Sequence, residues 1–297
     1  MKISILCRGH SMLSTASEIC QSNVVTEVAL LDENHGLYRN AIQDLQEANA
    51  LAGRDTALSL SSDAAVLSGS QVVVLLPPSS RTVLRSPQAH RATNTSLVRH
   101  YTKNIKQYAP TAKVLVAMPP ANFLAAFAQR ELDADGKQVI GLSSGIASGY
   151  LKAQIATQLS VSVRDVMTLV IGNDDTVYPL PQYCRVNGIP IDQLLSPDQI
   201  HELTEMVNER QRRSIHAEAP YSLSVWISQI ITAIALDKKR IMSVGSLVQA
   251  STSTAYLSVP SKIGADGVEE IIQLELTKAQ REQFTNLVAK SMAEQHQ

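Results

Sequence analysis

The sequence predicts an α/β protein, with a doubly wound parallel sheet in its first half and a mixed α+β domain in its second half. Short, continuous Val/Ile/Leu runs are typical of strands that are covered on both faces. Longer amphipathic segments alternate with these runs, as they do in repeated strand–helix units. The chain has 297 residues, of which 44% are hydrophobic, so it can bury a substantial core and is not disordered.

The first half contains five apolar runs that we predict as buried strands. The first is KISIL, directly after the initial methionine, and the third contains three consecutive valines. Two segments between the runs have apolar residues at helical spacing. The predicted strands are 2–6, 26–31, 71–76, 113–117 and 138–142, and the predicted helices are 38–51 and 96–108.

The second half lacks this regular alternation, which favours a mixed α+β domain. We place the boundary after residue 143, giving domains 1–143 and 144–297. Gly264-Ala265-Asp266-Gly267 is a strong turn signal, and Thr277 is suited to cap a final helix. The other predicted elements are helices 151–159, 196–213 and 222–236, and strands 166–171, 241–247, 255–259 and 268–274.

Composition excludes several classes of protein. Lys and Arg number 26 against 27 Asp and Glu, so the surface is not that of a nucleic-acid-binding protein. The three cysteines form no disulfide framework and have no C-x-x-C spacing, so we expect no metal. No apolar run is long enough for a membrane span. The start of the chain reads as a strand and not as a signal peptide, so we expect a cytoplasmic protein.

The loop after the first predicted strand stands where a dinucleotide-binding protein has G-x-G-x-x-G. Here it reads Cys7-Arg8-Gly9-His10-Ser11-Met12, and only the middle glycine is kept. Asp32 ends the second strand, where a ribose-binding acid would lie. Two interpretations stay open. Arg8, His10 and Ser11 bind a phosphate or another anion at a helix N-terminus, or the loop has drifted after losing its ligand.

Several segments resemble those of the lactate/malate dehydrogenase family. The clearest are GNDDTVYPLPQYCRVNGIPIDQLL and GADGVEEIIQLELTKAQREQF, while KISIL, VALLDENHG, SQVVVLLPP and QVIGL match the strands of the nucleotide domain in order. The resemblance covers nearly the whole chain. It implies a Rossmann-type sheet, a C-terminal domain of the lactate/malate dehydrogenase type, and a homo-oligomer, either a dimer or a tetramer.

The resemblance also implies where catalytic residues should lie, and those positions differ from the family pattern. The family's histidine falls in the segment that contains Asp174, its partner aspartate falls on Ala147, and its carboxylate-binding arginine falls on Tyr150. The substrate-holding asparagine falls on Pro119. Arginines that remain for substrate binding are Arg81 and Arg85, and residues that remain for a cofactor are Arg8, Gly9, His10, Ser11 and Asp32.

Loss of a proton-transfer unit removes most of an enzyme's rate, and an exposed aspartate such as Asp174 would be ionised and a poor proton donor. The sequence therefore predicts a family member that has lost hydride transfer, without a cofactor, in a binding, regulatory or scaffold role. Its partners would be itself, another protein or a small anionic ligand. The alternative is an NAD(P)-dependent oxidoreductase that acts on an atypical 2-hydroxy or 2-oxo acid.

Overall fold

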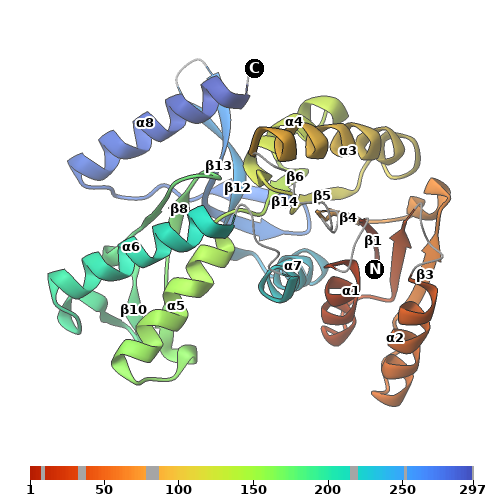
Figure 1. The fold of residues 1–297 in the computed structure, drawn as a ribbon, viewed down its shortest axis with the longest axis horizontal. Helices are drawn as coiled ribbons and strands as arrows, with labels where there is room; N and C mark the ends of the chain where they lie inside the picture. The colour runs from red at the N-terminus through yellow and green to blue at the C-terminus, as the bar shows by residue number, and fades with distance from the viewer. Residues whose placement is uncertain (8–10, 33–37, 78–86, 215–219, 251–252, 296–297) are drawn as a thin grey trace.

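The first half forms a six-stranded parallel sheet in the strand order β3-β2-β1-β4-β5-β6 (Figure 1). Its strands are short and are buried along almost their whole length, apart from the edge strand β3. Their bounds are β1 Lys2–Leu6, β2 Glu27–Leu31, β3 Ala57–Ser61, β4 Val72–Leu75, β5 Lys113–Val116 and β6 Val139–Gly141. The computed structural model describes residues 1–7, 11–32, 38–77, 87–214, 220–250 and 253–295.

Alternation along each strand sends apolar side chains to both faces of this sheet. Ile3 and Ile5 of β1 face one layer of helices, while Leu6 faces the other. The first layer holds α1 and α2, and the second holds α3 and α4 together with the short 3₁₀ helix η2. Their bounds are α1 Ser11–Gln21, α2 Arg39–Leu51, η2 Ala64–Leu67, α3 Pro87–Tyr108 and α4 Ala121–Leu132.

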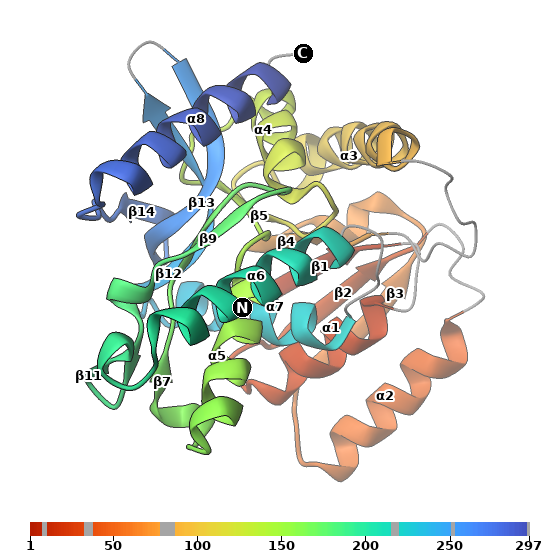
Figure 2. The ribbon, with the colours of Figure 1, turned by 60° about the vertical axis from the view of Figure 1, so that its left-hand side comes forward.

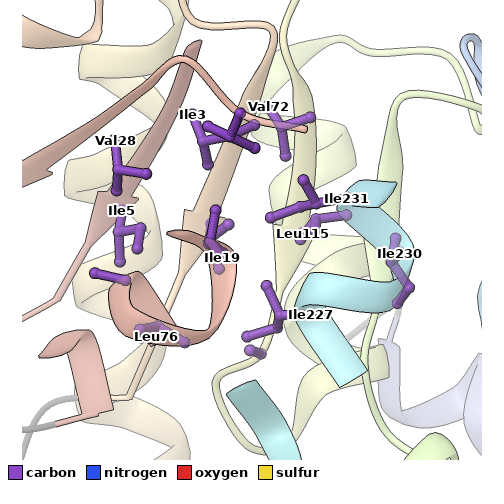
Figure 3. Packing of buried hydrophobic residues seen from close by; sticks show 14 of the residues in the cluster. Ile3, Ile5, Ile19, Val28, Val72, Leu76, Leu115, Ile227, Ile230 and Ile231 are labelled. Atoms are coloured by element: carbon purple, nitrogen blue, oxygen red, sulfur yellow. The ribbon is translucent and has the colours of Figure 1, made fainter. Parts of the chain in front are cut away.

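Helix α7 (Pro220–Ala235) belongs to the second half of the sequence but packs beside α1 on the parallel sheet. Ile19 of α1 and Ile227 and Ile231 of α7 meet the same sheet face (Figure 3). The Thr15 and Ser224 hydroxyls lie 3.1 Å apart between the two helices. The two halves of the chain therefore share one apolar core.

The second half extends the same sheet with antiparallel strands. β12 (Arg240–Ala250) pairs with β6, and β13 (Ser253–Gly264), β8 (Val170–Gly172) and β9 (Val177–Pro179) follow in that order. β14 (Gly267–Ile271) pairs with β13, and β7 (Val166–Met167), β10 (Arg185–Val186) and β11 (Ile189–Pro190) form a separate small sheet. The remaining elements are α5 Gly145–Leu159, η3 Val163–Asp165, η4 Pro181–Tyr183, η5 Ile191–Gln193, α6 Pro197–Ser214 and α8 Lys278–Gln295. Figure 2 shows α5 and α6 beside each other and α8 over β13.

The predicted fold class is confirmed: a Rossmann-type parallel sheet is followed by a mixed α/β half. The prediction missed β3, whose sequence ALSLS has few of the branched residues that mark buried strands. It also missed α4, and it treated residues 166–171 as one strand where the structure has two, β7 and β8, in different sheets. No helix in the described ranges combines the length and apolar character that crossing a membrane requires.

Candidate active site

The candidate site lies along the carboxyl edge of the parallel sheet. The strand order reverses between β1 and β4, and ligands of open α/β sheets bind at such a reversal. The loops that follow these two strands are in contact. The Cys7 thiol and the Ser11 hydroxyl, which follow β1, lie 3.3 Å and 3.4 Å from the carbonyl oxygen of Pro77, which follows β4. Ser11, which we predicted to bind an anion, thus has a partner within the chain.

Asp32 lies just after β2 on the same edge. It is only 2% exposed, and its backbone N–H donates to the Ser61 carbonyl, which fixes its position against β3. A carboxylate at the end of this strand is the group that accepts hydrogen bonds from a ribose diol. The described residues therefore fit the ribose of a dinucleotide. The predicted cofactor residues Arg8, Gly9 and His10 lie outside the described residues.

Asp174 lies further along the edge, where the β8–β9 turn meets the N-terminus of α4. Its two carboxylate oxygens accept hydrogen bonds of 3.0 Å each from the backbone N–H groups of Asn122 and Phe123. The free N–H groups and dipole of a helix N-terminus favour a negative charge there. Since α4 follows β5, Asp174 lies on the part of the edge that serves the second mononucleotide half.

The environment of Asp174 raises its pKa to about 6 from an ordinary value of 3.8. Burial has the largest effect, because desolvation disfavours the charged carboxylate. The N–H groups of Asn122 and Phe123 act in the opposite direction, the Asp175 charge raises the pKa further, and a hydrogen bond with Ser143 lowers it. The expectation that this carboxyl is exposed and simply ionised is wrong. Near neutrality it can both hold and release a proton.

Hydrogen bonds within the turn, from Ser143 and from α6 fix the turn that carries Asp174. The Asn173 side-chain oxygen accepts from the backbone N–H groups of Asp175 and Thr176, at 3.0 and 2.8 Å. The Ser143 hydroxyl, after β6, donates to the Asn173 carbonyl at 3.3 Å. Gln211 of α6, only 7% exposed, donates to the Asp174 carbonyl at 2.9 Å.

Other predicted positions lie apart from this carboxyl. Ala147 is buried in the apolar cluster of the second half, and the partly buried Tyr150 packs against that cluster. Pro119 precedes α4, and its carbonyl oxygen accepts a hydrogen bond from the Asn94 side chain at 2.6 Å. Arg81 and Arg85 lie outside the described residues.

Arg91 of α3 was not among the predicted site residues, although the structure brings it to this region. Its guanidinium carbon lies 3.6 Å from the centroid of the Phe123 ring, and one guanidinium nitrogen donates to the Glu294 carbonyl at 2.8 Å. Phe123 also supplies an N–H to Asp174. Arg91 is therefore linked to the Asp174 carboxyl through Phe123. The sequence offered Arg91 and Arg85 alike as arginines close to the family's mobile loop, but only Arg81 had a clear counterpart there.

A hollow of about 350 Å³ opens at the other end of the sheet, lined by Ser70, Gln71, Tyr108 and Lys113 among others. It lies at the amino ends of β4 and β5, away from the strand reversal and from Asp174. Size alone does not make it the site, because in open α/β sheets ligands bind outside the carboxyl ends. Among the described residues, no cluster of three or more His, Cys, Asp or Glu could hold a metal ion.

The strand order and the carboxyl edge define a dinucleotide-binding α/β protein. Residues 1–141 match the NAD binding domain of lactate/malate dehydrogenase, and residues 150–295 match the alpha/beta C-terminal domain of the same enzymes. The chain belongs to the lactate/malate dehydrogenase family.

Named relatives match the chain over nearly its full length. Malate dehydrogenase from Thermomicrobium roseum is 30% identical, over 94% of this chain and 92% of its own. Malate dehydrogenase from Methanosarcina barkeri is 29% identical, over 95% of this chain and 94% of its own. The solved structure of malate dehydrogenase from Salinibacter ruber is 26% identical, with a TM-score of 0.90 over 99% of this chain and 96% of that one.

These relatives correct the prediction that the protein has lost hydride transfer. Proteins named malate dehydrogenase match both halves without a missing domain, which supports an active dehydrogenase. The match of residues 1–141 to an NAD binding domain likewise favours a nicotinamide cofactor over the expectation of none. The physical reason for the error is that we took a substituted position to be an empty one, although a carboxyl such as that of Asp174 is also able to hold and release a proton.

Proposed function

We propose that the protein is an active NAD(P)-dependent dehydrogenase that interconverts a 2-hydroxy acid and its 2-oxo acid. The observation that carries this proposal is Asp174, a partly buried carboxyl with a pKa of about 6 on the carboxyl edge of a dinucleotide-binding sheet. The names of the relatives make malate and oxaloacetate the first pair to test.

A bound nicotinamide would accept the hydride in the oxidative direction and donate it in the reductive one. Asp32 would hold the adenosine ribose, and Gly9, with the N-terminus of α1, would approach the pyrophosphate. Arg81 or Arg85 would bind the substrate carboxylate, as the family resemblance implies. Arg91 would add positive charge behind Phe123.

Asp174 would carry the proton. In the oxidative direction its carboxylate takes the hydroxyl proton while the carbon–hydrogen bond breaks and the carbonyl forms. In the reductive direction its protonated form returns that proton to the carbonyl oxygen. The neutral acid also lessens the repulsion that an ionised aspartate would exert on an anionic 2-oxo acid. This counters the electrostatic objection that the sequence alone raised.

The pH dependence follows from these protonation states. Reduction needs the protonated carboxyl, so its rate should fall as the pH rises through about 6. Oxidation needs the carboxylate, so its rate should rise through the same value. Rates would be measured with oxaloacetate and pyruvate in one direction and malate and lactate in the other, with both nicotinamide cofactors, between pH 5 and 8.

Asp174→Asn tests the assignment, because the amide cannot carry the proton. We expect kcat to fall by roughly 10²–10⁴, the usual contribution of a general acid or base. The matched control is Asp192→Asn, an exposed aspartate in η5, which should leave kcat unchanged. Equal activity of Asp174→Asn and the unaltered protein would remove Asp174 from the mechanism, and no turnover of any 2-oxo acid would remove the proposed function.

Asp32→Asn tests the cofactor separately. Binding of NADH, followed by its fluorescence, should weaken at least several-fold, because the ribose diol loses a charged acceptor. Tight NADH binding that is indifferent to Asp32→Asn would place the adenosine ribose elsewhere.

Association and location are also part of this proposal. We propose a homodimer or homotetramer, supported by family membership and by exposed apolar side chains such as Tyr221 and Val225 of α7. Light scattering after gel filtration would test it, and a monomer at working concentrations would contradict it.

Cytoplasmic location is supported by Cys7, Cys20 and Cys184, which are free and buried. The domain boundary after residue 143 falls between β6 and α5 and stays a prediction.

A further inference from the structure

The C-terminal helix α8 reaches the turn that carries Asp174. Asn173 is 3% exposed and Ser291 of α8 is 1% exposed, and the Asn173 amide donates to the Ser291 hydroxyl at 3.1 Å. A hydrogen bond between two buried side chains that are 118 residues apart in the chain is a specific link between the helix and the turn. Figure 1 shows α8 running above β13 and ending near α4.

Both the oxygen and the nitrogen of the Asn173 side-chain amide form hydrogen bonds. The oxygen accepts from the backbone N–H groups of Asp175 and Thr176, while the nitrogen is held by Ser291. The Asn173 backbone also closes the turn, since its N–H donates to the Thr176 carbonyl at 2.9 Å. Orientation of the residue directly before Asp174 is therefore set by a hydroxyl on α8.

The last turns of α8 are themselves fixed to the body of the protein. Gln295 is 3% exposed, and its amide exchanges two hydrogen bonds with the backbone of Tyr256 in β13, at 2.8 and 2.9 Å. The Glu294 carbonyl accepts from Arg91. Ser291 thus lies on a segment that cannot shift without breaking contacts to both the sheet and α3.

We propose that Asn173 and Ser291 form a positioning pair through which α8 holds Asp174 at the reacting substrate atoms, an inference that rests on the proposed function. Neither side chain is a catalytic residue, because each acts through the turn. Small displacements of a reacting group lower rates steeply, since proton transfer requires hydrogen-bond geometry. The pair makes the C-terminal helix a determinant of kcat, although Ser291 touches Asp174 only through its neighbour.

Ser291→Ala tests the pair, because it removes the hydroxyl and leaves the helix intact. We expect kcat to fall about tenfold while the KM for NADH stays unchanged, since a misplaced acid slows chemistry and not cofactor binding. Ser291→Thr keeps a hydroxyl and should restore most of the rate. Thr285→Ala is the matched control, because that exposed hydroxyl of α8 bonds only within its own helix at the Arg281 carbonyl.

A second measurement reads the geometry without activity. Carbon-13 NMR of the aspartate carboxyls, with the Asp174 signal assigned by its loss in Asp174→Asn, gives the pKa of Asp174 in each variant. In Ser291→Ala a loosened turn should admit water and shift this pKa toward its ordinary value, while Thr285→Ala should leave it in place. The Asp175 charge acts on the Asp174 pKa, Lys290 pairs with Asp175, and Arg91 lies over the Phe123 ring; none of these variants alters these three residues.

The two measurements separate the outcomes. A shifted Asp174 pKa in Ser291→Ala, in a protein without turnover, would show that Ser291 orients the turn but would reject the proposed function and, with it, a role of the pair in catalysis. Unchanged kcat and unchanged Asp174 pKa in Ser291→Ala, with only a lower melting temperature, would show that Ser291 merely stabilises the fold and would overturn the inference.

Discussion

Asp174 combines two opposing effects within one side chain. Burial alone would keep its carboxyl neutral, and the N-terminus of α4 alone would keep it ionised. The balance leaves the pKa at about 6, near the pH at which a proton-transfer group is most useful. This balance therefore depends on the burial of the carboxyl and on the two N–H groups of Asn122 and Phe123.

The family resemblance aligned Asp174 with the segment of the family's histidine, but the sequence could not reveal the pKa of Asp174. A carboxyl in the segment Asn173-Asp174-Asp175 reads as exposed, because such runs usually form solvated turns. Burial arises only when α4, α6 and the turn after β6 close around it, through Asn122, Ser143 and Gln211. Those contacts join segments that are 30 to 52 residues apart, and no local pattern encodes them.

Asp174 should also make stability depend on pH in an unusual direction. Its folded-state pKa of about 6 exceeds the ordinary 3.8 of an unfolded chain. Between these values the folded state binds more protons, so the free energy of unfolding should fall as the pH rises from about 4 to 6. The full contribution is about 3 kcal/mol for a shift of this size.

Urea unfolding of the unaltered protein and of Asp174→Asn, at several pH values, would measure this contribution. Groups that do not interact with Asp174 titrate equally in both proteins, so the difference between the two curves reports Asp174 and its coupling to Asp175. The unaltered protein should lose stability relative to Asp174→Asn as the pH rises through this window. A constant difference would mean that the Asp174 pKa is ordinary.

At the scale of elements, α5 begins where α7 packs most closely against it. A Cβ built on Gly145 would overlap the Trp226 ring, well under the 3.0 Å that real Cβ atoms respect. The stretch Ser143-Ser144-Gly145, between β6 and the first turn of α5, is therefore closely packed. Ser144 is buried, and its hydroxyl lies 3.0 Å from that of Ser243 in β12.

Gly145→Ala should therefore destabilise the protein by about 1–3 kcal/mol, the cost of overpacking a filled contact. Gly149→Ala, in the same helix, is the control, because its Cβ would meet nothing within 4 Å. That change should stabilise the protein by up to about 1 kcal/mol, since alanine favours helix. Fluorescence of Trp226, the one tryptophan in the chain, would follow unfolding in both variants. Equal stability of Gly145→Ala and Gly149→Ala would show that α7 can move away from α5 with no loss in the free energy of unfolding.

Fully buried strands were predicted more accurately than half-exposed ones. The sequence predicted β1, β4 and β5 nearly to the residue, because each is a short Val/Ile/Leu run buried on both faces. The half-exposed strand β3 was not predicted, since its two leucines alternate with small alanine and serine side chains. Residues 166–171 were predicted as one strand because the run is apolar, although β7 ends at Met167 and β8 begins only at Val170.

For the whole molecule, the main consequence of the fold is that one sheet crosses both halves. β6 of the first half pairs with β12 of the second at Gly141 and Gly245. Asn122 fills the space beside them, with 0% exposure, and its amide donates to the Ser258 hydroxyl at 3.2 Å. The sequence predicted two domains but not this shared sheet, because the pairing depends on two isolated glycines.

Gly245→Ala should uncouple the halves, because the new Cβ would overlap both the Asn122 side chain and the Gly141 backbone. We expect a loss of about 1–3 kcal/mol and unfolding curves that no longer coincide between Trp226 fluorescence and far-UV circular dichroism. Adding Asn122→Ala removes one of the two overlaps, so the double variant should lose less than the sum of the single losses. Additive losses with coincident curves would mean that the β6–β12 junction is not what joins the halves. In that case the contact between α1 and α7 would have to join them.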